Sequence, residues 1–204
     1  ENVRGEKGGF IDEKQEHLYR QRGEDMLRRV LNNPGPFKKK AVKIQKDLLN
    51  YWLSEEEEII LCGKIDWMEY LEDEDAVHII DFKTGQHKQE GSLQLPIYYL
   101  LATNSQKRVV NQMSYWYIAL DDELTNQELP DPEKAYQEVI SIARKIKLAR
   151  QLQKFDCPKH TCRQCEPFER ILKGEGKLIG VDDFRRDVYV LPDKDDDETN
   201  EVIL

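Results

Sequence analysis

Long apolar runs are missing from this sequence. No stretch approaches the roughly 18 to 20 consecutive apolar residues that a membrane-spanning helix needs. The N-terminal segment ENVRGEKGGF also lacks the apolar region that a signal peptide carries. We therefore expect a soluble, cytoplasmic protein without a membrane partner.

Cysteine is scarce as well, since the 204 residues include only 4. That number is too small for the disulfide framework of a secreted protein of this size. Three of the four, Cys157, Cys162 and Cys165, fall within nine consecutive residues. Such crowding indicates metal binding in a reducing compartment rather than disulfide bonding.

An excess of basic residues is also absent. The 31 Lys and Arg residues against 40 Asp and Glu residues give a formal net charge of −9, which argues against a protein that coats nucleic acid through general positive charge. A local basic channel is compatible with this total, because residues 182–201 are rich in Asp and Glu. We expect residues 1–191 to form one domain and residues 192–204 to be an acidic, disordered tail.

Apolar residues at helical spacing predict three long helices and one short one. Their ranges are 13–32, 92–104, 131–154 and 167–173. The third helix is expected to face inward through Tyr136, Val139, Ile140, Ala143, Ile146 and Leu148. The basic residues on its other side, and the lysines of residues 38–46, are either solvated surface or contacts for a nucleic-acid backbone.

Alternating or aromatic-rich segments predict three strands, at residues 59–70, 76–82 and 111–120. The first two are separated by an acidic, turn-like segment and are therefore expected to form an antiparallel hairpin. Cys62, in the first of these strands, is expected to be a small buried residue.

Two acids and a lysine lie near the ends of the first two strands. Asp66 and Asp81 would lie on adjacent strands, and carboxylate oxygens are ligands that Mg²⁺ and Mn²⁺ prefer. Lys83 is two residues after Asp81 and so points to the same face of the strand. Its ammonium group can orient or help deprotonate a water while the metal stabilises charge on a phosphate. The combination indicates phosphodiester hydrolysis.

The surrounding residues make this pattern more specific. Gly63-x-x-Asp66 is followed by an apolar strand that leads into Asp81-Phe82-Lys83-Thr84-Gly85, and then by Gln94-x-x-x-Tyr98. This order resembles the RecB-like branch of the PD-(D/E)XK nuclease superfamily. The resemblance implies a mixed α/β (α+β), restriction-endonuclease-like core, with a mixed central sheet and an active-site hairpin flanked by helices.

The resemblance also implies residue roles. Asp66 and Asp81 would bind Mg²⁺ or Mn²⁺ together with the backbone carbonyl of Phe82. Lys83 would position the water. Gln94 and Tyr98 would line the site and touch the nucleic-acid strand, with a role as a core aromatic the alternative for Tyr98.

The implied activity is that of a metal-dependent DNA nuclease, an exonuclease of repair or recombination type. Its substrate would be single-stranded DNA or DNA ends, and its partner a helicase or recombination protein. Members of this branch usually have a further Glu or His ligand N-terminal to the GxxD motif, which has no counterpart here. His17 and Glu24 of the first predicted helix are expected on the surface. The alternative function is therefore a non-catalytic nucleic-acid-binding or scaffold fragment of a larger helicase–nuclease.

The cysteine cluster leaves several interpretations open. Cys157, Cys162 and Cys165 resemble the three C-terminal cysteines that hold a 4Fe–4S cluster in related RecB-like nucleases. A Zn²⁺ site that adds His160 is the rival, and a protein without metal at these cysteines is the third possibility. A metal-binding interaction protein would explain the cysteines alone but would leave the acids and the lysine unexplained. The iron and zinc content of anaerobically purified protein separates these alternatives.

Overall fold

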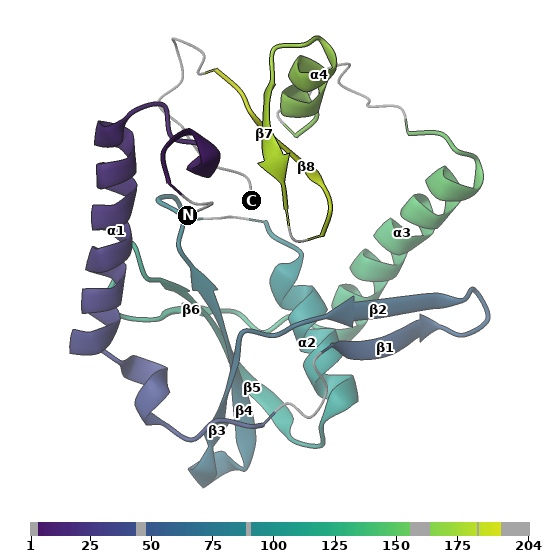
Figure 1. The fold of residues 1–204 in the computed structure, drawn as a ribbon. Coiled ribbons are helices and arrows are strands. Elements are labelled where there is room, and N and C mark those ends of the chain that lie inside the picture. Colours follow the sequence, from purple (N-terminus) through teal and green to yellow (C-terminus); the bar gives the residue numbers. More distant parts are fainter. Residues whose placement is uncertain (1–3, 44–47, 89–90, 156–163, 183, 193–204) are drawn as a thin grey trace. The chain divides into compact units, whose positions relative to one another are not determined.

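The computed structural model describes residues 4–43, 48–88, 91–155, 164–182 and 184–192 (Figure 1). The chain divides into two compact units. One consists of residues 25–154 and contains the main sheet. The other combines residues 1–24 with residues 155–204.

The larger unit is built on a four-stranded mixed sheet. Its strands lie in the order β3 (Trp67–Leu71), β4 (Ala76–Lys83), β5 (Val109–Tyr117) and β6 (Thr125–Gln127). The two central strands are parallel, and each edge strand is antiparallel to its neighbour. β4 is buried over its first six residues, as expected for a central strand covered on both faces. The expected mixed α/β architecture with a mixed central sheet is confirmed.

Helix α2 (Gln94–Ser105) connects β4 to β5. Parallel neighbours cannot be joined by a tight turn, so the chain must cross over one face of the sheet, and a helix commonly makes that crossing. Pro96 is the third residue of α2, in the first turn, where a missing N–H breaks no helical hydrogen bond. The predicted helix at residues 92–104 is confirmed.

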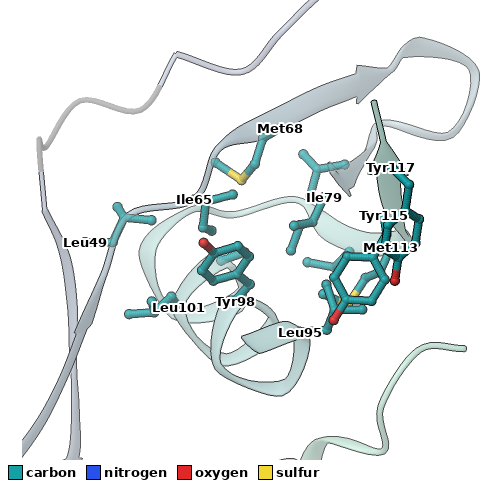
Figure 2. Close-up of a cluster of buried hydrophobic side chains, with 13 residues drawn as sticks. Leu49, Ile65, Met68, Ile79, Leu95, Tyr98, Leu101, Met113, Tyr115 and Tyr117 are labelled. Atoms are coloured by element: carbon teal, nitrogen blue, oxygen red, sulfur yellow. The ribbon is translucent and has the colours of Figure 1, made fainter. Parts of the chain in front are cut away.

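The main hydrophobic core lies between α2 and the sheet (Figure 2). Leu101 and Ala102 of the helix are 0% exposed, as are Val77 and Ile79 of β4. The remaining buried members of this cluster are Leu49, Ile65, Met68, Leu95, Tyr98, Val110, Met113, Tyr115 and Tyr117. This packing fixes α2 against the central strands.

The predicted strand at residues 59–70 is wrong as a single strand. Its first part is β2 (Ile59–Gly63), which pairs with β1 (Leu49–Ser54) as a separate antiparallel hairpin, and its second part is β3. The chain changes sheets after Gly63, where an added Cβ would lie 2.6 Å from Leu101 Cδ1. Polar and apolar residues alternate across the break, so periodicity could not reveal the change of partner.

The first part of this segment also corrects the expectation for Cys62. The side chains of β2 alternate between its two faces, and Ile59 is buried while Ile60 and Cys62 are exposed. The predicted burial of Cys62 is therefore wrong. The predicted antiparallel hairpin between residues 59–70 and 76–82 is confirmed for the part that forms β3. This strand is antiparallel to β4, with the acidic turn between them.

Helix α3 (Pro132–Gln151) is capped at its N-terminus by Asp131, whose side chain accepts a hydrogen bond from Lys134 N at 2.8 Å. Ala135, Val139 and Ile140 pack in a second cluster with residues of α2 and the β1–β2 hairpin. The expected inward orientation of Ile146 and Leu148 is wrong, since they are 54% and 55% exposed. The helical residues of the second cluster end at Ala143, so the rest of α3 extends past it.

An aromatic group covers the opposite face of the sheet. Phe37 in the short helix η2 (Gly35–Lys38) lies with its ring centroid 5.0 Å from that of Trp67 and 5.2 Å from that of Phe82. It also lies 5.8 Å from the ring of Trp116. Phe82 therefore packs away from the side of β4 that carries Asp81 and Lys83, as the alternation of a strand requires.

A buried polar row lies on the same opposite face. His78 Nε2 is 2.8 Å from Ser114 Oγ, and Ser114 Oγ donates to Asn126 Oδ1 at 2.9 Å. His78 Nδ1 is 3.5 Å from Glu69 Oε2, too far for a good hydrogen bond. Glu69 Oε1 pairs with Lys39 Nζ at 2.7 Å. Burial lowers the pKa of His78, because the charged imidazolium would lose its hydration, and the Glu69 carboxylate acts in the opposite direction.

The smaller unit contains short elements. They are η1 (Gly5–Gly8), α4 (Glu166–Leu172) and the antiparallel pair β7 (Lys177–Val181) and β8 (Asp187–Val190).

Helix α1 (Glu13–Asn32) confirms the predicted helix at residues 13–32, and none of its residues is buried. Among the described residues, no helix combines the length and the apolar character needed to cross a membrane.

The core packing predicts a large difference between two leucines. Leu101→Ala removes a side chain that is 0% exposed, and we expect the free energy of unfolding to fall by about 2 to 5 kcal/mol. Leu148→Ala is the control, because that leucine is 55% exposed and its loss should change stability by less than about 0.5 kcal/mol. Urea denaturation of both variants measures these values, and equal losses would contradict the placement of α2 and α3.

The buried histidine predicts a pH dependence of stability. The pKa of His78 is lower in the folded chain than its ordinary value of 6.5, so the unfolded chain binds more protons below that pH. The free energy of unfolding should therefore be highest above about pH 6.5 and fall below it, by at most about 1.4 kcal/mol per pH unit from this group. His78→Asn should lessen the fall between pH 7.5 and 5.5. An unchanged fall in denaturation experiments at these pH values would refute the prediction.

Candidate active site

Asp81 and Lys83 lie at the C-terminal end of β4, on the same face of the strand. Lys83 Nζ is 2.8 Å from Asp81 Oδ2, and the two side chains are 14% and 1% exposed. The prediction that the two residues are neighbours on one side is confirmed. A buried carboxylate is stable as an ion only when paired, so this ion pair is a requirement of the site.

Gln94 connects the two charged groups. Its amide oxygen accepts a hydrogen bond from Lys83 Nζ, and its amide nitrogen donates to Asp81 Oδ1 at 2.6 Å. The reverse orientation of the amide would place an NH₂ group against the ammonium and an oxygen against the carboxylate. A glutamine at the first position of α2 is therefore matched to both partners at once.

Tyr98 lies one turn further along α2. Gln94 Nε2 donates a hydrogen bond to Tyr98 Oη at 3.0 Å, so the two residues do lie on one helix face. Burial raises the pKa of Tyr98, and the hydrogen bond with Gln94 opposes that rise. With 8% exposure, Tyr98 is also a member of the main core. The two interpretations of this tyrosine are therefore compatible.

Asp66 reaches the site from the residue before β3. It is exposed, and its Oδ2 accepts a hydrogen bond from Phe82 N at 3.1 Å. Burial raises the pKa of Asp81, the Lys83 ammonium opposes the rise, and the Asp66 carboxylate adds to it. The Asp66 carboxylate therefore lies close enough to disfavour the charge of Asp81, which is an environment that a shared cation relieves.

The donors at this point fit a hard divalent cation. Asp81 Oδ2 is buried and has no hydrogen-bond partner apart from its ion pair with Lys83. The β3–β4 ladder stops at Ile80, and the N–H and C=O groups of a strand residue point to the same side. The carbonyl of Phe82 therefore faces the side on which Asp66 lies. Among the described residues no three His, Cys, Asp or Glu side chains cluster, but Mg²⁺ commonly binds one or two carboxylates and keeps several waters.

Tyr115 is a residue that the sequence did not identify. It is the Cα partner of Asp81 across the parallel β4–β5 pair, and it is 3% exposed. Lys83 Nζ lies 5.3 Å from the centroid of its ring. The aromatic content of residues 115–117 predicted a strand, but the register that places one of these rings at the site depends on the pairing of β5 with β4.

Several basic residues that were predicted to be solvated or to contact a nucleic-acid backbone bind other groups of the fold. Lys40 pairs with Glu72. Arg144 Nε donates to Glu57 Oε1 at 2.9 Å, and Lys147 donates to the Glu57 carbonyl. These basic groups therefore hold the segment after η2 and the β1–β2 turn, in addition to any role toward a nucleic acid.

Two further groups of residues were considered as metal ligands, one in the N-terminal helix and one in the cysteine cluster. His17 and Glu24 of α1 are exposed, and Glu24 pairs with Arg20 at 3.0 Å. Cys157, His160 and Cys162 lie outside the described residues. Cys165 is exposed at the start of α4, and the metal cluster at these cysteines stays a prediction.

Comparison with known proteins agrees with this geometry. A family model described as the PD-(D/E)XK nuclease superfamily matches residues 3–169. Neither the curated proteins nor the solved structures yield a match. The matched range covers most of the chain and every residue of the site from Asp66 to Tyr98. The chain therefore belongs to the PD-(D/E)XK nuclease superfamily, whose members are metal-dependent nucleases.

Proposed function

We propose that this chain is a Mg²⁺- or Mn²⁺-dependent deoxyribonuclease that hydrolyses phosphodiester bonds through Asp66, Asp81 and Lys83. The observation that supports it most strongly is the hydrogen-bonded cluster in which the Gln94 amide joins Asp81 to Lys83. A structural ion pair needs no third group matched to both charges. A site that must hold a carboxylate and an ammonium in fixed positions does need one.

Asp66 and Asp81 would hold the ion together with the Phe82 carbonyl. When bound there, a divalent cation supplies positive charge to the phosphate oxygens and to a water nucleophile. The hydrogen bond from Phe82 N keeps Asp66 beside Asp81. Because burial already raises the pKa of Asp81, the cation would also keep this carboxyl ionised.

Lys83 would orient the attacking water. Its ammonium has three N–H donors. It donates a hydrogen bond to the Gln94 amide oxygen and forms an ion pair with Asp81 Oδ2, and a further N–H can meet a water or a phosphate oxygen. Gln94 and Tyr98 use their polar atoms on each other and on the charged pair, so we assign them to positioning these groups.

We further propose an exonuclease of the RecB-like branch that acts on single-stranded DNA or DNA ends in repair or recombination. The order of the motifs Gly63-x-x-Asp66, Asp81-Phe82-Lys83-Thr84-Gly85 and Gln94-x-x-x-Tyr98 supports this narrower proposal. The alternative is a non-catalytic nucleic-acid-binding or scaffold module. It is favoured by the presence of only two carboxylates at the site within the part of the chain that the structure describes.

Substitutions at the charged pair test the enzymatic proposal. Asp81→Asn and Lys83→Met should each lower Mg²⁺- or Mn²⁺-dependent degradation of linear single-stranded DNA by about 10²-fold or more, because each removes a group that stabilises the transition state. Release of nucleotides from linear and from circular substrates measures the activity and separates an exonuclease from an endonuclease.

Two exposed residues supply matched controls. Asp73→Asn and Lys107→Met make the same chemical changes on the surface and should retain wild-type rates. Circular dichroism verifies that each variant is folded. Wild-type rates in Asp81→Asn or Lys83→Met would contradict the proposal. Absence of turnover, with DNA binding that survives both substitutions, would establish the scaffold alternative.

Metal binding can be measured without turnover. Mn²⁺ at about 100 times its dissociation constant should stabilise the folded chain by about 2.7 kcal/mol, which appears as a rise in the thermal midpoint that EDTA reverses. Asp81→Asn and Asp66→Asn should remove most of the rise, whereas Asp73→Asn should keep it. An equal rise in all four proteins would place the ion elsewhere.

A further inference from the structure

Strand β5 places two buried tyrosines, Tyr115 and Tyr117, side by side (Figure 2). The rings of Tyr115 and Tyr117 are 5.7 Å apart, and the residues are 3% and 2% exposed. Each ring lies below a different lysine. Lys83 Nζ is 5.3 Å from the centroid of Tyr115, and Lys88 Nζ is 5.6 Å from that of Tyr117.

One hydrogen bond and one ion pair leave a lysine side chain freedom to move. Its four-carbon stem is flexible, and its ammonium can rotate about the stem. The acceptors on Asp81 and Gln94 restrain Lys83 Nζ from two directions. The face of an aromatic ring attracts a cation through its quadrupole, so Tyr115 restrains the same group from a further direction.

Tyr115 is well placed to act as a rigid support. It belongs to the main core and pairs in register with Asp81, and close packing leaves a core side chain little freedom. Burial raises the pKa of its hydroxyl, and a hydrogen bond with the Ser92 side chain opposes that rise. The Ser92 hydroxyl also accepts from Gln94 N at 3.2 Å. Tyr115 is thereby connected to both residues that contact Lys83.

We propose that Tyr115 is a positioning residue that holds the Lys83 ammonium in its working orientation through the face of its ring. This inference rests on the proposed function of Lys83. Loss of the ring would let the ammonium leave the Asp81 and Gln94 acceptors for part of the time. The rate of the chemical step would fall, while the affinity for DNA, which does not depend on this orientation, would stay the same.

Three variants separate positioning from simple packing. Tyr115→Leu removes the ring, Tyr115→Phe keeps it, and Tyr117→Leu removes an equally buried ring that lies under Lys88. Tyr115→Leu should lower kcat by about 10- to 100-fold with little change in KM, since misplacing a catalytic group by about 1 Å can cost that much. Tyr115→Phe and Tyr117→Leu should both keep kcat within about threefold of wild type, when all are assayed well below their thermal midpoints.

Nuclear magnetic resonance of ¹³C-labelled lysine gives a second readout that needs no turnover. The ring current of Tyr115 should shift the ε-proton resonances of Lys83, which Lys83→Arg identifies. Tyr115→Leu should move these resonances and weaken their contact with the Gln94 side chain, whereas Tyr115→Phe and Tyr117→Leu should not.

Either readout can overturn the inference. Equal kcat values in Tyr115→Leu and Tyr117→Leu would show that packing alone explains Tyr115. Unchanged Lys83 resonances in Tyr115→Leu would show that the ring does not hold the ammonium. A wild-type chain without turnover, in which only Tyr115→Leu moves these resonances, would contradict the proposed function while supporting the placement of Lys83 by Tyr115.

Discussion

The buried ion pair between Asp81 and Lys83 is the interaction on which the rest of the site depends. A carboxylate that is 1% exposed loses most of its hydration, at an effective cost of several kcal/mol. The ammonium of Lys83 and the amide of Gln94 replace that hydration at 2.8 and 2.6 Å. Removal of either partner would leave a buried charge with too few contacts, so the three residues act as one unit.

The parallel pairing of β4 with β5 brings these three residues together. It requires a crossover, and α2 begins its crossing with Gln94 next to the end of β4. The helix can lie that close because Leu101 packs where Gly63 has no side chain. The same pairing sets Tyr115 beside Asp81. Core packing and site geometry are therefore consequences of one connection, in which the helix that covers the sheet also supplies a polar residue to its edge.

The candidate site was largely predictable because its chemistry is local in sequence. Asp81 and Lys83 share a face by the alternation of a strand, and Gln94 and Tyr98 share one by the spacing of a helix. The errors arose where partners are distant in sequence. Residues 59–70 resemble one continuous strand in sequence but pair with two different strands. Leu148 follows the apolar pattern of α3 but extends past the elements that would cover it.

The sequence by itself determined the motif residues and the order of the principal helices and strands, because these depend on spacing along the chain, and the resemblance carried by those motifs implied the α/β class. Only the tertiary structure decided that the Gln94 amide joins Asp81 to Lys83, that Phe82 N holds Asp66, and that Tyr115 lies beneath the lysine. These contacts depend on strand register and on the docking of α2, which buried packing sets across segments far apart in the chain. The residues from Asp66 to Tyr98 indicated the chemistry, and β5 with the core around it determines the geometry of the site.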